Sequence, residues 1–198
     1  MGLFNFFRRH KKSTADPVNA SKASPEHMLF AGTVLKIIGP TLESFGLALH
    51  KTEIEEYATT ITFRKDKQYI KISGSTYPTD HPYFYNIILG EGDSEDVREW
   101  DWNSIALWRL KLKMNPLATA KEYEFPDGDK VELSISNANK ELLQYAGAFL
   151  SGDMTLFYET RSEQNKTREP YKIYTPDENG NYTASDDPIS AEQKKKYS

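Results

Sequence analysis

The 198-residue sequence contains no cysteine, which excludes disulfide bonds, thiolate metal ligands and cysteine nucleophiles together. It also has no apolar run near the roughly 20 residues that a helix needs to cross a bilayer. The stretch 3–7 is too short, and too interrupted by Asn5, to form the apolar core of a secretory signal. Together these absences predict a cytoplasmic protein.

The sequence has no excess of positive charge either. It holds 25 Lys and Arg against 29 Asp and Glu, and its net charge is −4. A general nucleic-acid binder needs a basic surface that neutralises phosphates. No nucleic-acid partner is therefore expected.

The motifs of common catalytic sites are missing as well. There is no G-x-S-x-G turn, no G-x-x-x-x-G-K-[ST] loop and no H-E-x-x-H helix. Gly90-Glu91-Gly92 lacks the third glycine of a dinucleotide-binding loop, and the four histidines are dispersed along the chain. We therefore expect no catalytic residue, no metal site and no cofactor.

What the sequence does contain is clear hydrophobic periodicity, with aromatic residues at 13% of positions. Ser24-Pro25 is typical of a helix start, and apolar residues then recur at three- and four-residue spacing as far as Phe45. Gly39-Pro40 is expected to kink or restart this helix. An alternation with period two then predicts strands over 57–63, 69–72 and 83–89.

The second half of the chain continues with alternating elements. A helix is expected over 102–113, followed by a hairpin of 121–125 and 131–136 around Pro126-Asp127-Gly128-Asp129. Helices from Asn137 to Leu150 and from about Gly152 to Arg168 come next. The last elements predicted are a late hairpin around Asn179-Gly180 and a frayed C-terminal tail that includes residues 194–196.

This pattern predicts an α+β fold with an antiparallel sheet, formed by a meander plus a hairpin, and with helices packed on one face. The chain divides into a flexible leader (1–24), a single α+β domain (25–175) and a segment with the late hairpin and the frayed tail (176–198).

Carboxylates crowd residues 91–101, which we call the acidic segment. Three interpretations are open: a solvated loop, a surface that attracts a cationic protein, and a divalent-metal site. Trp102 and Arg109 follow closely, and both residue types are enriched in binding hot spots, although a role as core anchor also explains Trp102 and is the interpretation favoured for the tryptophans. The protein-binding interpretation selects Glu91, Asp93, Glu95, Asp96, Glu99, Asp101, Trp102 and Arg109.

The leader is a small basic and aromatic element. Such a segment can rest on an anionic membrane surface, with weak and reversible binding at this length. The alternative is a mobile tail. The membrane interpretation selects Leu3, Phe4, Phe7, Arg8, Arg9, Lys11 and Lys12.

Four segments together carry a resemblance: LESFG at 42–46, TITFR at 60–64, YIKI at 69–72 and PYFYNIILG at 82–90. Their order is similar to that of small bacterial domains of unknown function found among the immunity proteins of polymorphic toxin systems. The resemblance covers about residues 30–112. It implies a non-enzymatic protein that binds and blocks one cognate toxin, and it carries no site residue.

Three functional hypotheses follow. The first is a protein-binding module, with an immunity protein against a basic toxin as its narrower form. The second is a peripheral membrane accessory protein that uses the leader at the inner face of the membrane. The third is a hydrolase-like enzyme with a dispersed site, for which the first candidates are Asp80, His81, Tyr83 and Arg109.

Overall fold

The computed structural model describes residues 23–94, 96–119, 122–178 and 180–198. These residues form an α+β protein with an antiparallel sheet, which confirms the predicted fold class. The helices are α1 (Pro25–Ser44), α2 (Val97–Asn103), α3 (Leu107–Met114), the short 3₁₀ helix η1 (Gly128–Lys130), α4 (Val131–Leu150), α5 (Thr155–Lys166) and α6 (Pro188–Tyr197). The strands are β1 (Ala48–Ile54), β2 (Ala58–Lys65), β3 (Gln68–Ser75), β4 (Phe84–Glu91), β5 (Ser104–Ala106), β6 (Tyr123–Glu124), β7 (Lys172–Pro176) and β8 (Tyr182–Asp186).

The main sheet has the strand order β1-β2-β3-β4-β5, and β6 pairs with β4 beside β5. Every pairing is antiparallel, and β1 to β4 form a meander. In its register Ile61 lies opposite Ile72, and Ile72 opposite Ile87, so that aliphatic side chains of three neighbouring strands share one face. That face is the one that α1 and α4 cover, whereas α2 contacts Tyr69 and Lys71 on the opposite face.

Helix α1 begins as the sequence predicts. The Ser24 hydroxyl accepts a hydrogen bond from the His27 backbone N–H at 3.2 Å, and Pro25 occupies the first turn. Of the two alternatives expected at Gly39-Pro40, the restart is wrong, because the helix runs through Pro40 as one element. Pro40 lies on the exposed side, where water can satisfy the carbonyl that loses its donor. The helix ends before Gly46, whose positive φ of 84° suits glycine.

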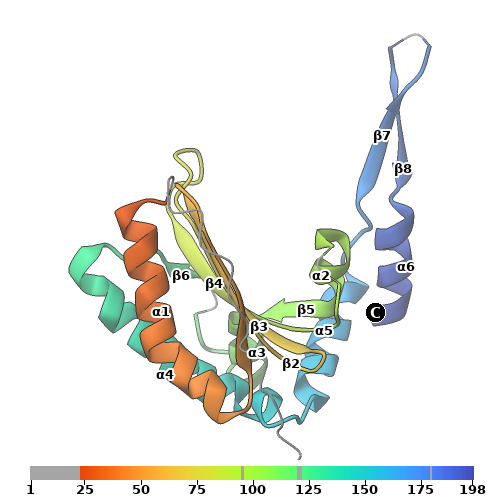
Figure 1. The fold of residues 1–198 in the computed structure, drawn as a ribbon. Helices are drawn as coiled ribbons and strands as arrows, with labels where there is room; N and C mark the ends of the chain where they lie inside the picture. The colour runs from red at the N-terminus through yellow and green to blue at the C-terminus, as the bar shows by residue number, and fades with distance from the viewer. Residues whose placement is uncertain (1–22, 95, 120–121, 179) are drawn as a thin grey trace, which may run out of the picture.

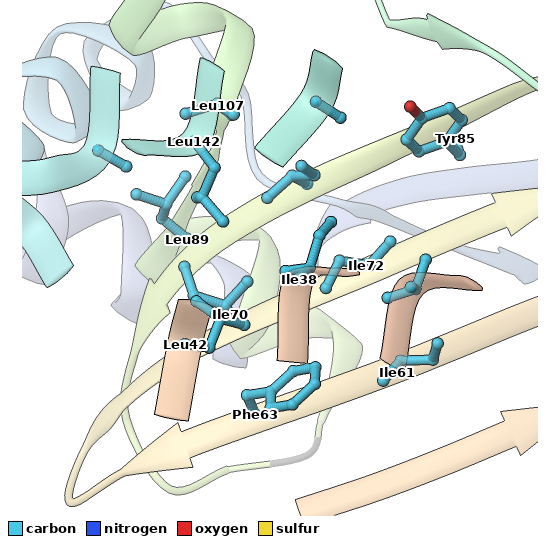
Figure 2. Packing of buried hydrophobic residues seen from close by; sticks show 14 of the residues in the cluster. Ile38, Leu42, Ile61, Phe63, Ile70, Ile72, Tyr85, Leu89, Leu107 and Leu142 are labelled. Carbon is cyan, nitrogen blue, oxygen red and sulfur yellow. The ribbon is translucent and has the colours of Figure 1, made fainter. Parts of the chain in front are cut away.

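The hydrophobic core lies between the sheet and the helices α1 and α4. Figure 2 shows Ile38 and Leu42 of α1 directed towards Ile70 and Ile72 of the sheet, with Leu142 of α4 close by. All of these side chains are fully buried. Burial of each large aliphatic side chain contributes about 1.5–3 kcal/mol, so this layer holds the fold together.

The hairpin predicted over 121–136 is wrong: the short strand β6 pairs with β4, and the second predicted strand is helical. Val131 begins the twenty-residue helix α4, and η1 occupies the expected turn. Val131, Ile135 and Leu142 recur with helical spacing and are all buried. A short apolar run such as 131–136 fits either a strand or a buried helix face, and packing against α1 selects the helix.

The helix predicted over 102–113 is confirmed from Leu107 on, but it is wrong as one continuous element. The three-residue strand β5 divides it into α2, which contains Trp102, and α3. Leu89 pairs with Ile105 across β4 and β5, so this segment gains sheet hydrogen bonds that a helix would lose. Strand β1 was not predicted, because it is a largely exposed edge strand with an irregularity between Leu49 and Lys51.

The remaining helices and the last two strands form a separate group. Figure 1 shows α2, α5 and α6 at the end of the sheet that carries β5, and the β7–β8 hairpin projecting away from the body. The late hairpin is thus confirmed, whereas the frayed tail is wrong: residues 194–196 belong to α6, which packs against α2 and α5. Asp187 caps α6 by accepting from the Ser190 N–H at 2.8 Å.

Candidate functional site

The β7–β8 hairpin, which we call the arm, is exposed at every residue of both strands. Tyr174 lies opposite Ala184, and Pro176 opposite Tyr182, so these four side chains share one face of the two-stranded ribbon. Tyr174 is 64% exposed and Tyr182 is 70% exposed. The arm therefore presents an apolar strip with two unburied aromatic rings.

The base of the arm is fixed to the body by several polar contacts. The Asp187 N–H donates to the Tyr171 carbonyl at 2.7 Å, so the two strands leave the body side by side. The Tyr171 N–H donates to Ser190 Oγ at 3.0 Å. Lys172 and Asp186 form an ion pair at 2.5 Å across the first residues of the arm. This anchoring gives the arm a defined direction.

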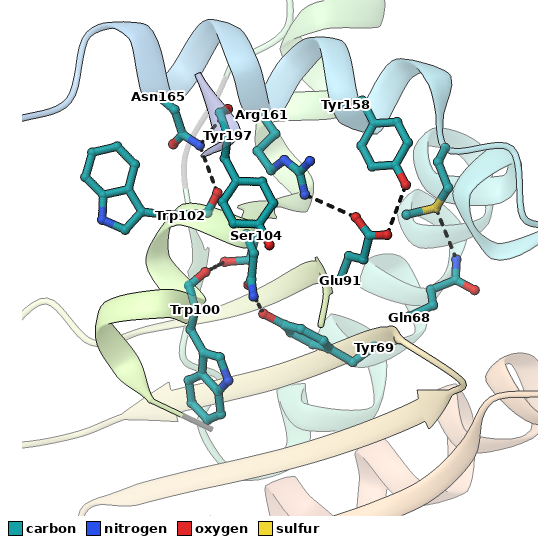
Figure 3. A network of polar contacts seen from close by, with 12 residues as sticks. Gln68, Tyr69, Glu91, Trp100, Trp102, Ser104, Tyr158, Arg161, Asn165 and Tyr197 are labelled. Carbon is teal, nitrogen blue, oxygen red and sulfur yellow. Dashed lines mark hydrogen bonds and ion pairs between the residues drawn. The ribbon is translucent and has the colours of Figure 1, made fainter. Parts of the chain in front are cut away.

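Trp102 anchors the arm from inside the body and is not a surface residue. Only 1% of it is exposed, and its indole Nε1–H donates to Ser190 Oγ at 2.9 Å. Its carbonyl accepts from Asn165 Nδ2 at 2.8 Å, as Figure 3 shows. The Arg168 guanidinium lies over its ring, 4.8 Å from the centroid. Of the two interpretations that the sequence leaves open, Trp102 takes the role of core anchor.

Asp101 at the end of the acidic segment also serves the arm. Its Oδ2 forms an ion pair with Arg168 Nη2 at 3.2 Å and accepts a hydrogen bond from the Tyr171 hydroxyl. Burial raises the pKa of Tyr171, and the bond to the Asp101 carboxylate raises it further. The Asp101 side chain of α2 therefore joins the base of the arm to Arg168, which follows α5.

Glu91 at the start of the acidic segment is paired as well. Figure 3 shows the Tyr158 hydroxyl and the Arg161 guanidinium directed at its two oxygens, at 3.1 and 3.4 Å. Arg161 is itself buried, and its guanidinium lies 4.3 Å from the centroid of the Tyr197 ring in α6. Glu91 thus links β4 to the last two helices.

The acidic segment is consequently less negative than its sequence indicates, since arginines neutralise both of its ends. Asp93 is exposed, Asp96 and Glu99 are half-buried, and Glu95 lies outside the described residues. Among the residues that the structure describes, no group of three or more His, Asp or Glu side chains is placed to hold a metal ion.

A groove runs along β4 on the face of the sheet opposite α1. It consists of two hollows of about 360 and 390 Å³ that share Asn86, Ile88 and Glu122. The first extends to Asp80 in the β3–β4 connection. The second extends over β5 to α3 and α5, where its lining includes Asp101, Trp108, Arg109, Gln164 and Arg168.

Arg109, selected from the sequence, lies at the second end of this groove. Its guanidinium lies over the Trp108 ring, 4.5 Å from the centroid. Burial lowers the pKa of Arg109, and the nearby positive charge of Arg168 lowers it further. Arg109 forms no ion pair with any residue that the structure describes. It is a half-buried cation whose charge the neighbouring side chains do not neutralise.

The candidates for a dispersed enzyme site do not line one cavity. Asp80 lies at one end of the groove, where it accepts from Ser75 Oγ at 3.4 Å, and Arg109 lies at the other end. His81 and Tyr83 line a separate hollow of about 470 Å³ beside Phe125. The structure therefore does not bring these four residues together.

The proposed membrane contacts of the leader, Leu3 to Lys12, lie outside the described residues. Among the helices that the structure describes, none is both long enough and apolar enough to cross a membrane.

The exposed strip of the arm was not identified as a site from the sequence. The turn residues around Gly180 predict the hairpin, and Tyr174 and Tyr182 are visible in its strands. A hairpin that is predicted from sequence usually packs one face on a core, and only the structure shows that this one projects from the body.

Comparison with protein-family models, with curated proteins and with solved structures finds no match for the chain.

Proposed function

We propose that the protein is a non-enzymatic protein-binding module that contacts its partner through the arm. The observation that carries this proposal is the apolar strip of Tyr174, Pro176, Tyr182 and Ala184 on a hairpin with no buried residue. Exposed contiguous apolar surface commonly marks an interaction site, and tyrosine is enriched in binding hot spots.

The anchoring of the arm supports the same proposal. An isolated two-stranded hairpin is at best marginally stable in water. Here the buried Trp102 and Ser190, together with the Asp101–Arg168 pair, hold its base. A preorganised arm loses less conformational entropy on binding than a free segment would lose. Trp102 and Asp101, selected from the sequence as contacts of a partner, would then act by positioning the arm.

The narrower form of the proposal is an immunity protein that blocks one toxin, and it rests on the resemblance over residues 30–112. The arm would reach the toxin, and the exposed Asp93 would contribute charge towards a basic partner. Its test is growth: if a neighbouring gene encodes a protein that stops the growth of a bacterial host, production of this protein in the same cells should restore growth. Loss of this rescue when Tyr174 and Tyr182 are changed to serine would link it to the arm.

The broader proposal is tested by photo-crosslinking in the native host. A photoreactive amino acid is placed at Tyr182 and, as a matched control, at Leu143, which is 44% exposed on α4. The position in the arm should yield one discrete crosslinked protein, and the control position should not. Tyr174→Ser should abolish the crosslink without a change in melting temperature.

Two results would count against the proposal. One is equal crosslinking from both positions, which would indicate random collision. The other is a discrete crosslink from Tyr182 that persists in Tyr174→Ser. A crosslink to a second copy of the same chain would assign the arm to self-association and would overturn the immunity form.

A further inference from the structure

The groove along β4 has the shape of a site for an extended chain. Strand β5 pairs with residues 88–90 of β4, and β6 pairs with Phe84 and Tyr85. Asn86 and Ile87, between them, have no neighbouring strand on that edge among the described residues. The two hollows meet at this gap, since both are lined by Asn86 and Ile88. The groove is therefore elongated and follows the direction of the strand.

One end of the groove is lined by two arginines, Arg109 and Arg168, of which only Arg168 is paired with a carboxylate among the described residues. Asp101 already pairs with Arg168, so Arg109 is the guanidinium that lacks a carboxylate. Its contact with the Trp108 ring holds the plane of the guanidinium. A planar guanidinium binds a carboxylate through two parallel N–H···O bonds, and a half-buried location strengthens such a pair. An incoming carboxylate would also relieve the repulsion between the two arginines.

The other hollow of the groove is anionic, since Asp80 lines its far end and Glu122 lines both hollows where they meet. Asn86 donates through Nδ2 to Glu122 at 2.7 Å, while its Oδ1 is buried and accepts no hydrogen bond from the residues that the structure describes.

We propose that the groove binds an extended peptide segment, with an acidic side chain of the segment held by Arg109 and a basic side chain near Glu122 and Asp80. The inference adds to the proposed function the chemistry of one contact with the partner. It rests on the proposed function only where it assigns the bound peptide to a partner protein. It differs from the sequence-based expectation, in which the acidic segment selects a cationic partner.

The test is an NMR titration of the full chain with two probes. The first probe is a short acetylated and amidated peptide that carries one lysine and one glutamate three residues apart. The second is glutarate, which supplies the carboxylate alone. The side-chain amide of Asn86 and the indole N–H of Trp108 should shift in a saturable way. The peptide should bind about tenfold more tightly than glutarate, because it uses both ends of the groove.

Variants assign the binding to Arg109. Arg109→Gln should weaken peptide binding by about tenfold or more. Arg109→Lys should weaken it by less, because lysine keeps the positive charge but cannot form the two parallel hydrogen bonds of a guanidinium. The matched control is Lys36→Gln on α1, an exposed cation on the opposite side of the sheet, and it should leave the affinity unchanged. Melting temperatures show whether each variant is folded.

Three outcomes would overturn the inference. These are no saturable shift with either probe, a peptide affinity that is equal in the wild type and in folded Arg109→Gln, and glutarate binding as tightly as the peptide. The last result would assign the site to a small carboxylate. Crosslinking from the arm is independent of these titrations, so failure of the groove and failure of the arm can be told apart.

Discussion

His27 is a histidine enclosed by two threonines. Its ring nitrogens lie 2.7 Å from Thr59 Oγ1 and 2.9 Å from Thr76 Oγ1, and the side chain is fully buried. In the neutral ring one nitrogen donates and the other accepts, which two hydroxyls can satisfy. Burial lowers the pKa of His27, and the charge of Glu26 opposes this only in part. The sequence alone offers no sign of this arrangement.

The lowered pKa of His27 predicts a loss of stability in mild acid. The unfolded chain takes up this proton near pH 6.5, whereas the folded chain takes it up at a lower pH. The free energy of unfolding should therefore fall as the pH drops below about 6.5, by at most about 1.4 kcal/mol per pH unit for this group. Denaturant titrations from pH 8 to pH 5 would measure it. His27→Gln should show a shallower dependence, and equal slopes would contradict the assignment.

Gly90 shows a second requirement of a single residue. A Cβ at this position would lie 2.0 Å from Cζ of Tyr69, a buried ring whose hydroxyl donates to Asn103 Oδ1 at 2.9 Å. Gly90→Ala should destabilise the fold by about 1–3 kcal/mol or more. Gly147→Ala in α4 is the control, because its Cβ meets nothing within 4 Å and should stabilise the helix by about 0.5–1 kcal/mol. Chemical denaturation measures both, and wild-type stability of Gly90→Ala would refute the contact.

At the level of elements, Ser190 joins α2, α6 and the arm. Its Oγ accepts from Trp102 Nε1 and from the Tyr171 N–H. Ser190→Ala should cost about 1–3 kcal/mol, because the buried indole N–H of Trp102 and the partly buried N–H of Tyr171 both lose their acceptor. Ser185→Ala in the exposed strand β8 should stay within about 0.5 kcal/mol of the wild type. Similar melting temperatures of the two variants would mean that this junction does not hold the arm.

The arm itself should be dispensable for folding. None of its residues is buried, and the Asp187 N–H already bonds to the Tyr171 carbonyl, so a short turn can join these two residues. Replacing residues 172–186 by such a turn should leave the melting temperature within a few degrees, since exposed ion pairs such as Lys172–Asp186 contribute about 0–1 kcal/mol. Differential scanning calorimetry measures the change. A large drop would show that the arm belongs to the folding core.

The elements that could be predicted are those with an unambiguous local signal. Helix α1 has a cap, a proline at its start and a long apolar stripe, and the β2–β3 and β7–β8 hairpins have turn residues between alternating strands. The failures share a different cause. The run 131–136 is too short to distinguish a strand from a helix, and β5 forms only because β4 offers it a partner. Tertiary contacts decide such segments.

The candidate site could be predicted only in part for a similar reason. Arg109 was selected from the sequence and does line a groove. Trp102 was selected as well, yet it is buried, because residue type alone cannot separate a hot spot from a core anchor. The charges of Glu91 and Asp101 appeared free in the sequence, since their arginine partners follow about 70 positions later. Pairing over such distances leaves no local signal.

Over the whole molecule, stability should be distributed unevenly. The central strands β2, β3 and β4 have neighbours on both sides and a buried face, whereas the arm has one pairing and no buried residue. Hydrogen–deuterium exchange should therefore be slowest in β3 and fast in β7 and β8. Exchange in the arm as slow as in β3, in dilute solution, would mean that the arm is already covered in an assembly.

The side-by-side attachment of the two arm strands has a consequence for how such a chain can diversify. Because the strands leave the body at Tyr171 and return at Asp187, the arm is a segment whose two ends are already joined by a hydrogen bond. Residues can be added to or removed from it in pairs without moving α5, α6 or any strand of the main sheet. Substitutions on its exposed faces escape the packing constraints that fix Trp102 and Ser190. The length and sequence of the arm can thus change from one protein to another while the body stays the same.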